Sequence, residues 1–113
     1  MSSERPSSSG APPPIAEIDR LIHEPARLLL VSCLYVVKAA DFVFLSRQTG
    51  LTGGNLSSHM SRLEDAGYVR VDKKFVGKRP QTVLRLTAKG RAAFRDYRRA
   101  MTGVLEPDPE ASR

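Results

Sequence analysis

The stretch from Leu51 to Asp65, LTGGNLSSHMSRLED, combines an apolar stripe with short polar side chains. Leu56, Met60 and Leu63 recur at positions i, i+4 and i+7, so they predict a helix that buries one face. The other faces carry groups that form hydrogen bonds with base edges and phosphate oxygens. The candidate contact residues are Thr52, Gly54, Asn55, Ser57, Ser58, His59 and Arg62.

Each kind of side chain in this set suits a different part of a nucleic acid. Asn55 can pair with N6 and N7 of adenine, His59 can donate to a guanine acceptor or a phosphate, and Arg62 can reach guanine or the backbone. Gly53 and Gly54 expose backbone N–H groups at the positive end of the helix dipole, where a phosphate can approach closely. Two simpler interpretations stay open: the glycines only make the turn flexible, and His59 is an ordinary surface histidine.

A basic hairpin is predicted directly after this helix. Val69 and Val71 alternate with polar residues, and the returning strand alternates in the same way from Thr82 to Leu86. Gly77 supplies the freedom that a turn between the strands needs. The hairpin cations that we expect to contact phosphates or to enter a minor groove are Lys73, Lys74, Lys78 and Arg79.

Positive charge is concentrated in the second half of the chain. Residues 15–66 contain five basic and six acidic residues, whereas residues 67–105 contain eleven basic and two acidic residues. A field of this kind favours a polyanionic partner, and nucleic acid is the commonest one. The alternative is that the charge serves solubility alone.

Length and composition predict one folded domain between two tails. Residues 1–14 and 106–113 are rich in Ser, Pro and charged residues and are expected to be disordered, which leaves residues 15–105 for the domain. The single cysteine, Cys33, excludes an internal disulfide and is predicted to be a buried packing residue. With no apolar run of membrane-spanning length and no secretion signal in the first residues, we expect a cytoplasmic protein, associated with the nucleoid when it is bound to DNA.

The sequence predicts a series of helices, followed by the hairpin and one more helix. A short first helix covers 15–22, a second begins at Pro25 and is apolar on nearly every side, and Asp41 is available as the N-cap of a third. Gly50 ends that third helix, Thr52 caps the next, and Gly67 ends it. Two short helices joined by a tight glycine-containing turn constitute a helix-turn-helix. The fold class is therefore α+β and mainly α, with four to five helices and a two-stranded hairpin wing.

The apolar stripe of the short first helix needs a neighbour, either in its own subunit or in a second copy, and part of the stripe on the last helix is expected to lie in a dimer interface. The last helix begins at the cap Thr87 and has a broad, partly aromatic apolar stripe. Its arginines, Arg91, Arg95, Arg98 and Arg99, could extend the DNA footprint, but a solvated face that flanks the dimer interface is the favoured interpretation. The expected interface residues are Ile15, Ile18, Leu21, Ile22, Phe94, Tyr97, Met101 and Val104.

Several motifs in sequence order resemble a known family. The segments IDRLIHEPARL, ADFVFLSRQTGLTGGNLSSHMSRLEDAGYV and FVGKRPQTVLRLTAKGR are similar to small winged-helix transcriptional regulators of bacteria and archaea related to the MarR and ArsR groups. The resemblance covers residues 15–105. It implies a homodimer that presents two recognition helices to successive major grooves, with Lys78 and Arg79 at the wing tip. The single cysteine does not supply the cysteine pairs of the ArsR-type metal sensors.

These observations predict a sequence-specific DNA-binding regulator that binds a pseudo-palindromic operator as a dimer. Repression is favoured over activation, because a compact dimer can act by occluding a promoter. The alternatives are a winged-helix module that binds an acidic protein and a nonspecific architectural DNA-binding protein. No nucleophile–base pair, carboxylate pair or phosphate-binding loop indicates an enzyme, no cofactor or metal is expected, and no effector ligand can be named.

Overall fold

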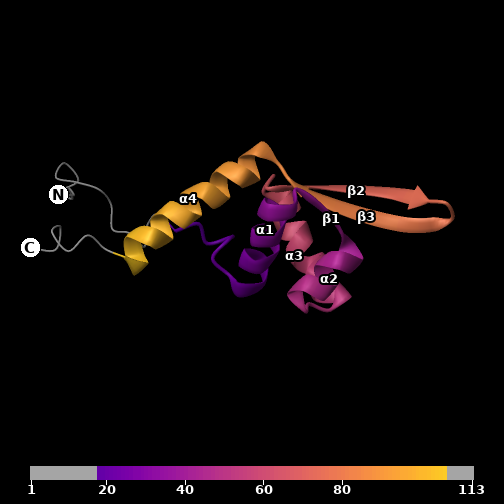
Figure 1. Cartoon of the computed structure of the whole chain (residues 1–113), viewed down its shortest axis with the longest axis horizontal. Helices are drawn as coiled ribbons and strands as arrows, with labels where there is room; N and C mark the ends of the chain where they lie inside the picture. Colours follow the sequence, from indigo (N-terminus) through magenta and orange to yellow (C-terminus); the bar gives the residue numbers. More distant parts are fainter. Residues whose placement is uncertain (1–17, 107–113) are drawn as a thin grey trace, which may run out of the picture.

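The computed structural model describes residues 18–106 as four helices and a three-stranded sheet (Figure 1). The predicted fold class, a mainly helical winged helix-turn-helix, is confirmed. None of the helices in this part of the chain is long and apolar enough to cross a membrane. The elements in chain order are α1 (Pro25–Val37), β1 (Ala39–Asp41), α2 (Phe42–Thr49), α3 (Gly53–Asp65), β2 (Val69–Val76), β3 (Arg79–Leu86) and α4 (Ala88–Leu105).

The sheet is antiparallel, with strand order β1-β3-β2. Its longer part is the predicted hairpin, in which Val76 pairs with Arg79 across a two-residue turn, and Gly77 adopts a φ of 67° there. The hairpin extends away from the helices in Figure 1. The third strand was not predicted: β1 adds to the outer side of β3 with Ala40 opposite Leu84, where the sequence suggests only a break between helices.

Short polar side chains fix the start of every helix. The side chains of Glu24, Asp41, Thr52 and Thr87 each accept a hydrogen bond from the backbone N–H three residues further on. Asp41, Thr52 and Thr87 were predicted as caps, and each such cap contributes about 1 kcal/mol. Gly50 ends α2 in the left-handed conformation with a φ of 74°, as predicted.

The core lies where α1, α3 and the base of the hairpin meet, with α4 covering one side. The predicted stripe of α3 is buried there against one face of α1. Burying side chains of this size stabilises the fold by about 1.5–3 kcal/mol each. The buried hydrophobic residues are Ile22, Leu30, Val31, Leu34, Ala40, Leu45, Leu56, Met60, Leu63, Val69, Leu84, Leu86, Phe94 and Tyr97.

Only one side of α1 is buried, contrary to the prediction of a helix enclosed on nearly every side. Leu29, Val36 and Val37 are exposed, Val36 to 77%. Cys33 is half-buried and free, and this burial raises the pKa of its thiol. These residues line a shallow surface groove of about 350 Å³. A domain of this size has too few neighbouring elements to cover a fully apolar helix.

The predicted first helix is absent from the described part of its range, because residues 18–24 form a turn. The Asp19 carboxylate accepts hydrogen bonds from the backbone N–H groups of Leu21 and Ile22, at 2.9 and 3.2 Å. This side chain offers the backbone an alternative to helical pairing. Ile22 is fully buried by the turn. Ile15, the N-terminal tail and residues 107–113 of the predicted C-terminal tail lie outside the described residues.

A close backbone contact joins the base of the hairpin to α4. The Thr87 hydroxyl donates to the Gly67 carbonyl at 2.6 Å, and the Thr87 N–H donates to the Tyr68 carbonyl at 3.0 Å. One turn into α4, a Cβ on Gly90 would overlap that same Tyr68 carbonyl oxygen. Glycine at position 90 therefore lets the start of α4 lie directly against the chain that leaves α3.

Gly90→Ala is expected to lower the free energy of unfolding by about 1–3 kcal/mol, because backbone atoms would have to move apart. The matched control is Gly103→Ala in the same helix, where an added Cβ has no neighbour within 4 Å. Removing that glycine should raise stability by about 0.5–1 kcal/mol. Urea denaturation measures both changes, and a stabilising Gly90→Ala would contradict the packing described here.

Candidate nucleic-acid interface

The side of α3 opposite its buried stripe is open to solvent. Gly54, Asn55, Ser57, Ser58 and Arg62 are exposed there, as predicted. Thr52 is exposed too, but its hydroxyl accepts from the Asn55 N–H and so serves as the helix cap. Ser61 and Asp65 also lie on this surface and were missed, although their spacing of three and seven residues from Ser58 places them on its face. The surface is thus made of short side chains that leave the helix backbone accessible.

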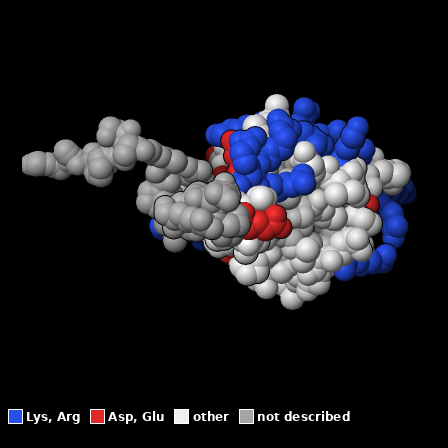
Figure 2. Space-filling model, turned by 60° about the vertical axis from the view of Figure 1, so that its left-hand side comes forward, with Lys and Arg blue, Asp and Glu red and all other residues white. Residues whose placement is uncertain are grey.

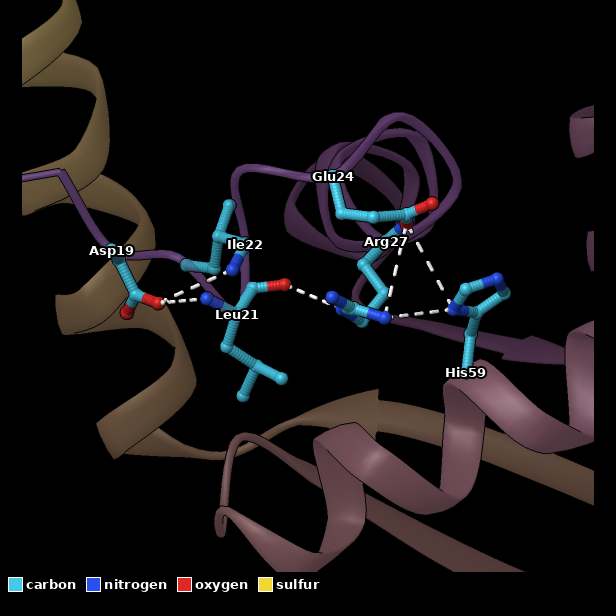
Figure 3. Close-up of polar contacts among 6 residues, drawn as sticks. All are labelled: Asp19, Leu21, Ile22, Glu24, Arg27 and His59. Atoms are coloured by element: carbon cyan, nitrogen blue, oxygen red, sulfur yellow. Dashed lines mark hydrogen bonds and ion pairs between the residues drawn. The ribbon is translucent and has the colours of Figure 1, made fainter.

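His59 does not lie on this exposed face, which corrects its predicted position. Its side chain is 20% exposed and points toward the start of α1 (Figure 3). Its Nδ1 lies 3.0 Å from a terminal nitrogen of Arg27 and 3.8 Å from Oε1 of Glu24. Because arginine can only donate, the Nδ1 of His59 is the acceptor in this contact.

Arg27 joins three parts of the chain in the same cluster. Its Nε donates to the Leu21 carbonyl of the turn, and a terminal nitrogen donates to His59 of α3. Glu24 accepts from the Arg27 backbone N–H at 2.8 Å, which is the main cause of its lowered pKa, and the positive charge of Arg27 adds to the effect. The cluster therefore fixes the orientation of α3 relative to α1 and the turn.

A groove of about 840 Å³ runs between α2, α3 and the hairpin. Three cations face it, Arg47, Lys73 and Arg79, together with polar side chains from α3 and β3. Its one carboxylate, Asp41, already accepts from the Phe44 N–H and from Gln81. The complete lining is Asp41, Phe42, Val43, Arg47, Ser57, Met60, Lys73, Val76, Arg79, Pro80, Gln81 and Thr82.

The predicted cations of the hairpin do not all share this groove. Lys73 and Arg79 line it, whereas Lys74 is absent from its walls. Lys78 is exposed in the turn at the tip. Arg47 was missed by the sequence analysis: it stands in the last turn of α2, 26 residues before Lys73, and only the fold brings the two to one groove.

Neighbouring cations on the hairpin are already paired. Arg70 and Arg85 lie opposite each other on β2 and β3 and both contact the Asp72 carboxylate, at 3.2 and 3.7 Å. This pairing partly neutralises them, so the unpaired charge of the hairpin lies nearer its tip and beside the groove. Within residues 18–106, no three His, Cys, Asp or Glu side chains are grouped so that they could hold a metal ion.

The residues predicted for a dimer interface fall into two groups. Ile22, Phe94 and Tyr97 belong to the core of the protomer, and the Tyr97 hydroxyl lies 2.8 Å from Nδ1 of His23. These three side chains are therefore unavailable to a second copy, which corrects their predicted place. Ile18, Leu21 and Met101 are half-buried and Val104 is exposed, so these residues remain open to a partner.

Arg27→Met should lower the free energy of unfolding by about 1–3 kcal/mol, because the Leu21 carbonyl and the His59 ring would lose their donor in a half-buried place. The Arg27 side chain is only 11% exposed. The control is Arg99→Met, which breaks a pair with Asp96 whose arginine is 76% exposed and should change stability by less than about 0.5 kcal/mol. Thermal unfolding measures both variants. If Arg27→Met and Arg99→Met changed the stability equally, the cluster would not hold α3 in place.

Comparison with known proteins agrees with this geometry. The chain is 32% identical over 78 residues to the uncharacterised protein MJ0432 of Methanocaldococcus jannaschii, a stretch of 69% of this chain and 85% of that protein. A transcriptional regulator homologue of Pyrococcus horikoshii OT3 superposes with a TM-score of 0.77 and 28% identity, over 82% of this chain and 94% of the other.

A variant of MarR from E. coli complexed with operator DNA shares the fold, with a TM-score of 0.61 and 20% identity over 81% of this chain and 71% of that one. A family model described as winged helix DNA-binding domain matches residues 26–105, which runs from α1 to the end of α4. With the capped helix-turn-helix, the basic hairpin and this match in place, the chain belongs to the family of winged helix DNA-binding domains.

Proposed function

We propose that this protein is a sequence-specific transcription regulator that binds duplex DNA as a homodimer. The observation that carries the proposal is the continuity of two surfaces: the exposed polar face of α3 and the groove with its three cations. Ser57 belongs to both surfaces. A helix placed in the major groove would thus have cations beside it at the position of the flanking phosphates.

The residues divide between reading bases and holding the backbone. Asn55 and Arg62 are the side chains on the exposed face of α3 that can form paired hydrogen bonds with adenine and guanine. Gly54 and the serines allow close approach, and Arg47, Lys73 and Arg79 contact phosphates from the groove. His59 acts indirectly in this scheme, since its contacts with Arg27 orient the helix. Lys78 at the tip extends along the backbone or into the minor groove.

Known relatives support DNA as the partner. The P. horikoshii neighbour is described as a transcriptional regulator homologue, and the E. coli neighbour was solved with operator DNA. We extend this to a pseudo-palindromic operator with half-sites about 34 Å apart, the spacing that a two-fold symmetric pair of recognition helices requires. Repression follows from the size of the domain, since a bound dimer occludes the promoter. The proposed location is the cytoplasm, on the nucleoid DNA.

The C-terminal half of α4 is the proposed dimer interface. Phe94 and Tyr97 bury the first half of the helix against the protomer, but the apolar positions beyond them continue without a cover. Met101 is half-buried, and Val104 is 40% exposed. A second α4 packed on this surface would bury these side chains and place the two domains symmetrically.

Met101→Glu combined with Val104→Glu should weaken dimerisation by at least about 100-fold, because each carboxylate would lose water in the interface without gaining a partner. Light scattering after size-exclusion chromatography measures the change. The matched control is Leu29→Glu with Val36→Glu, which places the same charges on the exposed face of α1 and should leave the dimer intact. Dissociation by the control pair alone would move the interface to α1.

The test of the function is selection of random duplex DNA on the full chain, followed by titration of the selected sequences against salt. An inverted repeat bound with a steep salt dependence is the expected result. Arg47→Gln with Lys73→Gln should then reduce the slope of log affinity against log salt by about 2, and weaken binding to all sequences alike.

Three other results would contradict the proposal in different ways. Salt-dependent binding without enrichment would indicate a nonspecific architectural protein. No binding at all would favour a winged-helix module for an acidic protein. An unchanged salt slope in the double variant would remove the groove from the interface.

A further inference from the structure

The arginines of α4 form a second basic surface that the proposed operator contact leaves unused. Arg91, Arg95 and Arg98 follow one another at spacings of four and three residues, so they lie along one side of the helix. With a rise of 1.5 Å per residue, this arginine stripe is about 10 Å long. A duplex presents one phosphate charge per ~1.7 Å of its axis, so about six phosphates lie within the length of the stripe.

Two of these guanidinium groups are held in place by an aromatic ring. Arg91 and Arg98 lie over the ring of Tyr35 from α1, at 5.2 and 5.8 Å from its centroid, and that ring packs against Phe94 at 5.0 Å. Among the described residues, none of the three stripe arginines forms an ion pair, whereas the neighbouring Arg99 pairs with Asp96. The stripe therefore presents positive charge that is fixed in position and not neutralised within residues 18–106.

The arginine stripe faces away from the operator-binding surface. α4 packs on α1 and β3, so that α1 lies between it and the exposed face of α3. In Figure 1 α4 lies to the left of α1, and α2 and α3 lie below and to the right of α1. Figure 2, which draws all Lys and Arg in one colour, shows positive charge concentrated on the upper side of that view. The exposed face of α3 and the arginine stripe thus lie on different sides of α1.

The stripe also avoids the proposed dimer interface. At about 100° per residue, Arg91 and Arg98 lie on one flank of the buried line through Phe94 and Tyr97, while Ala100 and Val104 lie on the other flank. Packing two copies through the second flank leaves the arginines in solvent. The stripe thus stays available in the dimer.

We propose that the arginine stripe of α4 binds the phosphate backbone of a second DNA duplex, so that the protein at its operator bridges two DNA segments. This rests on the proposed function for the first duplex but uses different residues. A duplex suits the stripe better than an acidic protein does, because protein interfaces need a buried apolar or aromatic centre, and the accessible part of the stripe is guanidinium. Guanidinium groups bind phosphate oxygens in a paired geometry.

The experiment captures a fluorescent random-sequence duplex on beads that carry a second random-sequence duplex saturated with the full-length protein. Arg91→Gln, Arg95→Gln and Arg98→Gln are combined in one variant. We expect the variant to bind the immobilised duplex within about twofold of the parent and to capture the second duplex about tenfold less, with the capture falling steeply as salt rises. A dimer that bridged only through its two recognition helices would keep full capture in this variant.

Two further variants test whether the loss of capture comes from disturbed folding or from the lower net charge and not from the stripe itself. Arg95→Gln with Arg99→Gln leaves both arginines that contact Tyr35 in place and should still lower capture. Arg20→Gln, Arg70→Gln and Arg85→Gln together remove the same charge as the triple stripe variant from places outside the stripe and the groove, and should leave capture unchanged.

Four outcomes would overturn the bridging proposal. Equal loss of both duplexes in the stripe variant would place the arginines in the first footprint. Unchanged capture in that variant would exclude the stripe. A parent protein that binds the immobilised duplex but captures no second one would refute bridging and leave the operator proposal standing, whereas failure to bind any duplex would refute both.

Discussion

The structure depends on burying one side of α3 while the opposite side of the same helix stays in water. Leu56, Met60 and Leu63 provide the buried side, and they pack on a helix, α1, whose own buried face is formed by only three residues. The outward side is restricted to small and hydrogen-bonding groups, since a large apolar residue there would be exposed. The polar face is accordingly displayed by a helix that is anchored along its whole length.

Anchoring alone does not fix the direction in which a short helix points, and polar contacts along the helix do so. At the start, the Thr52 cap sets the angle from α2, and in the middle Arg27 ties His59 to the turn before α1. At the far end, the chain leaving α3 is joined to α4 through Thr87 and the close approach of Gly90 to Tyr68. The Tyr68 hydroxyl also donates to Asp19, and burial, together with this contact, raises the pKa of Tyr68 to about 12. The turn at 18–24 consequently touches both α3 and α4, although these helices make few contacts with each other.

Sequence reasoning succeeded where the determinants are local. The caps Asp41, Thr52 and Thr87, the left-handed Gly50 and the stripe of α3 all depend on residues within one or two turns of each other. It failed where the local structure depends on a residue or strand that is far away in the sequence. The helix expected at 15–22 competes with the Asp19 carboxylate, and β1 is too short to be recognised without β3 beside it. Helical spacing gives the angle of His59 from the apolar stripe but cannot reveal Arg27, 32 residues earlier, as its partner. For the same reason Arg47 and the groove could not be found, because three separate elements assemble it.

The distribution of charge explains how so small a domain tolerates a net charge of +6. Like charges on one surface would repel each other and destabilise the compact state. Here the groove cations lie on α2 and the hairpin, whereas the arginine stripe lies on α4, so the positive charge is divided between two surfaces. Asp72 partly neutralises the cations at the base of the hairpin, and the part of the chain up to Ala66 is slightly acidic. Repulsion is thus confined within each basic surface, where a phosphate backbone would relieve it, so DNA bound at one surface need not disturb the other.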